Sequence, residues 1–183
     1  MFRSFSFQLA NFIHGYWGAP YVCYMFMKKK TYIETSIVSY LTAWPSHDLI
    51  VAAHQKITDN WWKNHSSSFQ LHISEIVLDE ACLGDPEAAA KRLHALQGIE
   101  LLDVSNEATY LSEKLIAPGA LPSKAIEDAL HIAVATIHKM DYLLTWNCKH
   151  IANAQMRLII EKINHQYGYK TPVICTPEEL LGE

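Results

Sequence analysis

The sequence lacks the closely spaced cysteine and histidine pairs that usually hold zinc. Its four cysteines stand far apart without a CxxC pair, and its ten histidines include no HExxH motif. Zinc sites of these common kinds are therefore excluded, and a disulfide framework is not expected in a chain of 183 residues. Reduced thiols in a cytoplasmic protein fit this cysteine usage best.

The sequence also has no excess of basic residues and no phosphate-binding loop. Fifteen Lys and Arg against nineteen Asp and Glu give a formal net charge of −4, so charge alone does not indicate a nucleic-acid substrate. The absence of a Gly-rich phosphate loop and of a GxSxG motif argues against P-loop nucleotide hydrolysis and serine hydrolysis. Half of the residues are hydrophobic and 19% are charged, a balance that predicts one globular domain.

The first residues are set apart by their lack of charge. No charged side chain occurs between Arg3 and Lys28, and this stretch is rich in aromatic residues. A signal peptide or membrane anchor is one interpretation, but polar residues such as Gln8 interrupt the apolar run and no small-residue cleavage site is clear. We therefore expect a non-essential extension over residues 1–27, one folded domain over residues 28–183, and no membrane association.

From Lys30 onward, short apolar segments alternate with segments of helical periodicity. The pattern predicts strands at 31–33, 69–73, 99–104, 142–145 and 173–175, and helices at 35–41, 48–62, 74–82, 86–96, 105–117, 123–140 and 153–167. Such alternation indicates an α/β fold with a parallel sheet between helical layers. In such sheets, ligands bind beyond the carboxyl ends of the strands.

Two polar residues follow predicted strands at that edge. Glu34 comes directly after the first strand, and Asn147 comes just after the fourth. If these two strands are neighbours in the sheet, Glu34 and Asn147 share one rim. The alternative is that both residues simply end strands in solvated loops.

Further acids lie on two predicted helices. Asp128 stands in a helix with apolar residues all round, where a buried carboxylate requires a cation or hydrogen bonds, although a first-turn Asp favoured by the helix dipole is the alternative. The segment 74–80 holds three acids, and its spacing does not decide whether Asp79 or Glu80 points inward. Carboxylates that gather in one place repel each other, and Mg²⁺ or Mn²⁺ relieves that cost and supports phosphodiester cleavage.

Four segments together resemble the motifs of PIN-domain proteins, and most closely those of the VapC-type toxins of bacterial toxin–antitoxin pairs. The segments are Tyr32-Ile33-Glu34-Thr35-Ser36, Ser74 to Glu80, Glu127 to Ala133, and Leu143-Leu144-Thr145-Trp146-Asn147. The resemblance implies a three-layer α/β/α PIN-like fold with a central parallel sheet of four to five strands. It also implies Mg²⁺- or Mn²⁺-dependent cleavage of RNA.

The resemblance also assigns roles to single residues. Glu34, Glu80 and Asp128 are expected as the catalytic metal ligands, and this choice of Glu80 breaks the tie with Asp79. Asn147 is expected to assist catalysis. Supporting and phosphate-binding positions complete the set: Ser36 and Thr145 beside the acids, and Lys124, Lys149 and His150 as phosphate candidates. For Lys124 a solvated first-turn position, and for His150 a helix-start position, are equally good interpretations.

The function implied is a metal-dependent endoribonuclease that acts as the toxin of a toxin–antitoxin pair. RNA would be its substrate and a small antitoxin its partner, and a homodimer is expected. Two departures from the family pattern motivate an alternative, because Glu34 stands where the family usually has Asp and Asn147 replaces an acid. The alternative is a catalytically weakened PIN-fold module that binds RNA or a protein partner. The aromatic pair Trp61-Trp62 either lines such a partner surface or packs in the core.

Overall fold

The fold is built on a parallel sheet. A computed structural model describes residues 28–117 and 120–181, so the predicted extension over residues 1–27 and the predicted helix end at Pro118-Gly119 lie outside the described residues. In sheet order the strands are β3 (Glu100–Leu102), β2 (Phe69–Ser74), β1 (Lys29–Ile33), β4 (Tyr142–Leu144) and β5 (Val173–Cys175). Each neighbouring pair is parallel.

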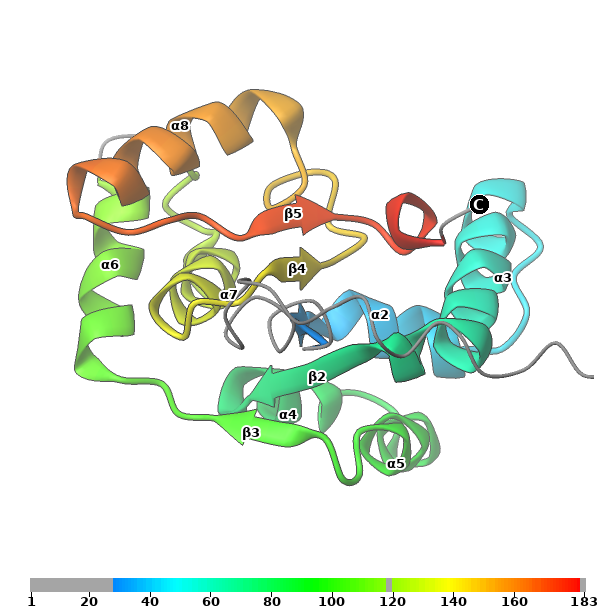
Figure 1. Ribbon diagram of the computed structural model, residues 1–183. Coiled ribbons are helices and arrows are strands. Elements are labelled where there is room, and N and C mark those ends of the chain that lie inside the picture. The colour runs from blue at the N-terminus through cyan, green and yellow to red at the C-terminus, as the bar shows by residue number, and fades with distance from the viewer. Residues whose placement is uncertain (1–27, 118–119, 182–183) are drawn as a thin grey trace, which may run out of the picture.

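Helices cover both faces of this sheet (Figure 1). One group holds α6 (Asn106–Ile116), α7 (Ile126–Ile137) and α8 (Ala154–Gln166), and the other holds α2 (Thr35–Thr42), α3 (Leu49–Asn64), α4 (Glu75–Ala81) and α5 (Pro86–Ala95). Short 3₁₀ helices, η1 (Ser66–Ser68) and η2 (Glu178–Leu180), complete the described elements. The predicted three-layer α/β/α PIN-like arrangement is confirmed.

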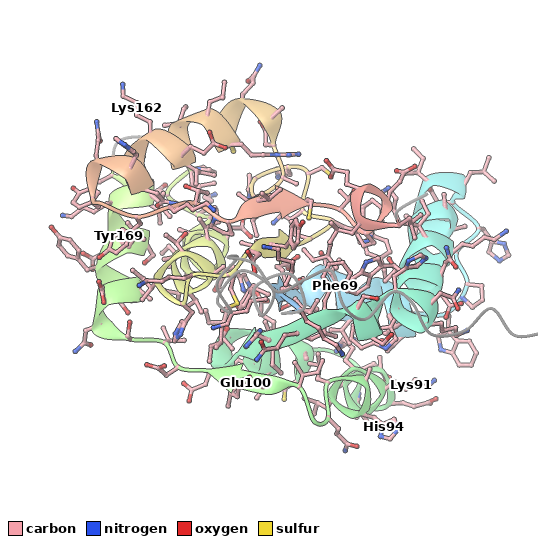
Figure 2. All side chains as sticks on the ribbon, in the orientation of Figure 1. Phe69, Lys91, His94, Glu100, Lys162 and Tyr169 are labelled. Atoms are coloured by element: carbon pink, nitrogen blue, oxygen red, sulfur yellow. The ribbon has the colours of Figure 1, made fainter. Side chains whose placement is uncertain are left out.

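Labelled side chains in Figure 2 help to locate the edge of the sheet and the outer side of a helical layer. Glu100 lies on the edge strand β3, and Lys162 lies on the outward side of α8. Phe69, at the start of β2, lies among aromatic rings, with its centroid 5.6 Å from that of Trp61 on α3 and 6.0 Å from that of Tyr142 on β4. These ring contacts join α3 to the amino-terminal edge of the sheet.

The strand order places a topological switch point between β1 and β4. The chain builds β1, β2 and β3 outward in one direction and then adds β4 and β5 on the other side of β1. In open α/β sheets, the crevice beyond the carboxyl ends at such a point is where ligands bind. Because β1 and β4 are neighbours, the residues that follow them share one rim, as the sequence suggested for Glu34 and Asn147.

The core lies on both faces of the central strands. Buried apolar residues from β1, β4 and α7 form its middle, and α7 is buried along most of its length. Local sequence signals start several helices: Asp48 caps α3 through bonds to the amides of Ile50 and Val51, and Pro86 occupies the first turn of α5. Among the described residues, no helix combines the length and apolar character needed to cross a bilayer.

A buried histidine on β2 predicts how stability depends on pH. His72 is 2% exposed, with Nδ1 3.0 Å from the carbonyl oxygen of Gln70. Burial holds the pKa of His72 below its ordinary value, although the charge of Glu100 acts in the opposite direction. Since the unfolded chain then takes up a proton more readily, the stability due to neutral His72 is present above about pH 6.5 and is lost as the pH falls through the folded-state pKa.

We therefore expect the free energy of unfolding to fall between pH 7 and pH 5 by more in the wild-type chain than in His72→Gln. Urea unfolding followed by tryptophan fluorescence at several pH values measures both curves. Equal pH dependence in the two proteins would show that His72 does not contribute.

Candidate metal site

Glu34 connects the end of β1 to the start of α2. Its backbone amide donates to the carbonyl oxygen of Leu144 (3.0 Å), which extends the pairing of β1 with β4. Its side chain caps α2, because Oε1 accepts the amide hydrogen of Ser36 at 3.0 Å. The carboxylate is therefore fixed at the carboxyl edge of the sheet, beside the switch point.

Two hydroxyl groups also hold this carboxylate, which is almost fully buried at 6% exposure. Thr145 Oγ1 donates to Glu34 Oε2 at 2.6 Å, and the hydroxyl of Ser36 donates to the same oxygen. Ser36 Oγ in turn accepts the amide hydrogen of Trp146 at 2.8 Å. The residues expected in supporting positions, Ser36 and Thr145, thus lie directly against the first acid, and their donors offset the cost of burying its charge.

Glu80 reaches the same edge from the last turn of α4. Its Oε2 atom accepts the hydroxyl of Thr35 and lies 3.0 Å from Nε2 of His131. The neighbouring Asp79 is exposed, whereas the Glu80 side chain is only 29% exposed. Sequence spacing left the choice between these two acids open, and the structure brings Glu80, rather than Asp79, to the rim where Glu34 lies.

His131 belongs to α7, and its side chain is buried, with 1% exposure. Its Nδ1 atom lies 2.8 Å from the hydroxyl of Tyr32, and that hydroxyl lies 2.6 Å from Oγ of Ser74. Tyr32 belongs to β1 and Ser74 ends β2, so the imidazole is anchored to two strands of the sheet. This orientation directs Nε2 toward Glu80.

Glu34, Glu80 and His131 form a group that can hold a cation. One ligand atom from each lies within 4.8 Å of the other two. With metal–ligand bonds of about 2.0–2.2 Å, two donors to one ion lie at most about 4.4 Å apart, so the separations in this group are close to those of a metal site. Two carboxylates and an imidazole are also a chemically suitable donor set for a divalent ion, so the residues present fit a metal.

The charges in this group depend on one another. Although burial alone raises the pKa of Glu80, the hydrogen bonds from His131 and Thr35 hold it below its ordinary value. Burial alone lowers the pKa of His131, but the hydrogen bond to Glu80 and the charges of Glu34, Glu80 and Asp128 together raise it above the usual range. The surrounding carboxylates thus favour the positively charged form of His131.

Asp128 lies in the first turn of α7, one turn before His131, and bonds with a different pair of residues. Its Oδ1 atom accepts from Nδ2 of Asn147 at 2.8 Å, and its Oδ2 atom lies 2.6 Å from Nδ1 of His150. Asn147 also accepts the amide hydrogen of His150 at 3.0 Å. The carboxylate expected as the third metal ligand is thus held beside the group of three, near enough for its charge to act on His131.

The remaining candidates fall into two classes. Lys124 and Lys149 are exposed, whereas His150, expected near phosphate, bonds with the Asp128 carboxylate. The sequence did not identify His131 as a site residue, although His131 lies in the PIN-like segment from Glu127 to Ala133. Its signal was its position three residues after Asp128, because residues at that spacing lie on the same helix face.

Comparison with known proteins gives structural relatives alone. No protein-family model matches the chain, and no curated protein matches it. Its structure is similar to that of VapBC2 from Rickettsia felis bound to a DNA fragment from its promoter, at 18% identity over 80% of this chain and 98% of that one, with a TM-score of 0.52. It is also similar to the structure of VapC20 of Mycobacterium tuberculosis, a sarcin–ricin loop cleaving toxin. The identity is 16% over 68% of this chain and 95% of that one, with a TM-score of 0.52. The chain therefore has the VapC-type PIN fold.

Proposed function

We propose that this protein is a metal-dependent endoribonuclease of the VapC type. The observation that carries the proposal is the convergence of Glu34, Glu80 and His131 at the switch point of a VapC-type fold. Ligands bind at this position in open α/β sheets, and clustered carboxylates favour a divalent cation. VapC20, which has a similar structure, is described as a toxin that cleaves the sarcin–ricin loop.

The chain's own residues would act mainly by holding and orienting the reacting groups. Glu34 and Glu80 would hold Mg²⁺ or Mn²⁺, and Ser36 and Thr145 would keep the Glu34 carboxylate in place. Asp128 would add a third carboxylate beside Glu34 and Glu80, and its bonds to Asn147 and His150 would fix its orientation. When bound, the divalent ion would promote ionisation of water and neutralise charge that develops on the phosphate.

The exposed lysines suggest how the RNA backbone would be held. Lys149 lies on the loop that carries Asn147 and His150, and Lys124 precedes α7. Because the net charge is −4, phosphate binding would depend on such local cations together with the metal ion. We propose both lysines as phosphate contacts.

A toxin of this kind requires a partner that restrains it. The VapBC2 assembly, whose structure is similar, supports a small antitoxin as that partner. We also propose that the chain forms a homodimer, which light scattering of the purified protein would test. Expression of this protein alone is expected to inhibit growth. Co-expression of the gene that lies immediately upstream would relieve this inhibition if that gene encodes the antitoxin.

One observation favours a second function, that of a binding module without turnover. Both oxygens of Asp128 are bonded within the protein, and Glu34 accepts three donors, so these carboxylates are compensated without a cation. Such a module would bind RNA or a protein partner through the same rim.

A cleavage assay separates the two functions. Purified protein is mixed with structured and unstructured RNA in the presence of Mn²⁺ or of a chelator. We expect cleavage that the chelator stops and that Asp128→Asn lowers by roughly 10–100-fold, the loss typical of residues that support a metal site. Glu127→Gln is the matched control, because Glu127 is the exposed neighbour in the same helical turn. Tight RNA binding without cleavage of any RNA would favour the module.

A further inference from the structure

The hydrogen bonds of His131 determine which of its nitrogen atoms faces the two glutamates. Nδ1 lies 2.8 Å from the Tyr32 hydroxyl oxygen. When Tyr32 donates its hydroxyl proton to Ser74, its oxygen accepts Nδ1–H. The lone pair of Nε2 then points to the side of the ring where Glu80 lies. Histidines that bind metals almost always donate their other ring N–H in this way.

The distances around Nε2 also fit coordination to one ion. Two ligand atoms at right angles, each about 2.1 Å from a cation, lie about 3 Å apart. Nε2 of His131 and Oε2 of Glu80 are separated by 3.0 Å, and one oxygen of Glu34 lies within 4.8 Å of the ligand atoms of both.

Asp128 competes poorly for the same ion. Its two oxygens are bonded to the amide of Asn147 and the imidazole of His150, at 2.8 and 2.6 Å. Among the described residues, the group whose ligand atoms all lie within 4.8 Å of one another includes His131 but not Asp128.

From this geometry we infer that the third ligand of the metal site is Nε2 of His131, and that the site selects a first-row transition ion such as Mn²⁺ or Zn²⁺ over Mg²⁺. Magnesium prefers oxygen ligands and dehydrates reluctantly, whereas imidazole suits transition ions. This inference rests on the metal dependence proposed above, and it specifies which ion the site takes. It also gives Tyr32 and Ser74 a role as positioning residues for the imidazole.

A spectroscopic measurement without RNA tests the inference. Mn²⁺ is added to the purified full-length protein, and electron spin-echo modulation records whether a ¹⁴N nucleus is coordinated to the ion. We expect ¹⁴N coupling in the wild-type protein and none in His131→Asn. His150→Gln is the matched control, because this histidine lies on the same rim, and its variant is expected to keep the coupling.

Affinities supply a second measurement. Equilibrium dialysis is expected to show at least about tenfold tighter binding of Mn²⁺ than of Mg²⁺. Tyr32→Phe keeps the ring in the core but removes the hydroxyl, so Mn²⁺ affinity is expected to fall by roughly 10–100-fold while the ¹⁴N coupling remains. Circular dichroism and thermal melting establish that each variant is folded. If His131→Asn does not fold, the wild-type spectrum and Tyr32→Phe still decide the question.

Three results would overturn the inference: Mn²⁺ bound by the wild-type protein without ¹⁴N coupling, coupling lost in His150→Gln but kept in folded His131→Asn, or Mg²⁺ bound as tightly as Mn²⁺. Each would indicate an all-oxygen site or a different histidine ligand. The result is separable from the proposed function, because nitrogen coordination without cleavage of any RNA would reject the nuclease and retain the metal site. Cleavage of RNA by a protein whose metal site has only oxygen ligands would support the nuclease and reject His131 as a ligand.

Discussion

Replacing Glu80 with glutamine is expected to lower metal-dependent RNA cleavage by roughly 10²–10³-fold, the loss that follows removal of a principal electrostatic stabiliser. Glutamine has nearly the same shape and can still accept the hydroxyl hydrogen of Thr35. It carries no charge, however, so the site loses one of its two carboxylates beside His131. Single-turnover cleavage of a labelled RNA at saturating Mn²⁺ measures the change in rate.

The adjacent Asp79 provides the control for this substitution. Asp79 is on the same helix, but it is exposed. Asp79→Asn removes an equal charge and is expected to leave the cleavage rate within about twofold, since surface substitutions away from special features usually change little. Equal losses in the two variants would mean that overall charge, and not coordination by Glu80, supports cleavage.

Replacing Trp61 with alanine is expected to lower the free energy of unfolding by about 3–5 kcal/mol, the usual cost of truncating a large buried aromatic residue. Trp61 is 0% exposed and lies between the rings of Trp62 and Phe69, at centroid distances of 6.3 and 5.6 Å. Its loss leaves a cavity between α3 and the sheet. Chemical denaturation monitored by far-UV circular dichroism gives the free energy directly.

Two further variants separate the causes of that loss. Trp62 is only half-buried, so Trp62→Ala is expected to cost clearly less than Trp61→Ala. The indole nitrogen of Trp61 is buried without a hydrogen-bond partner among the described residues, so Trp61→Phe loses volume but no hydrogen bond. A larger loss from Trp62→Ala than from Trp61→Ala would contradict the packing described here. The structure thus answers one question that the sequence left open, because Trp61 belongs to the core.

Most of the fold could be predicted because strong local signals agree with the tertiary structure. The predicted strand at 173–175 coincides with β5, and Asp48, the first residue of the helix predicted over 48–62, caps α3. The helix predicted over 123–140 was too long, since α7 extends from Ile126 to Ile137. Its N-cap, Ala125, has no side chain that can cap the helix, so nothing in the sequence marks the true start.

The site was harder to predict, because it depends on which side chains meet across the sheet. Glu34 could be identified from its place after an apolar strand, but Glu80 needed the family resemblance to be preferred over Asp79. His131 could not be distinguished from an ordinary core histidine, since its significance comes from Tyr32 and Glu80, which are distant in sequence. Likewise, nothing in the sequence indicates that Asn147 and His150 bond with the Asp128 carboxylate.

The position of β4 beside β1 has a consequence for the timing of synthesis. β1 ends at Ile33, whereas its neighbour β4 begins only at Tyr142, so a growing chain on the ribosome lacks the strand that completes this side of the sheet. Until β4 and the following loop have emerged, Glu34 has no bond from Thr145, and Asp128 has none from Asn147. The bonds that orient Glu34 and Asp128 would therefore form only after the segment from Tyr142 to Asn147 has left the ribosome.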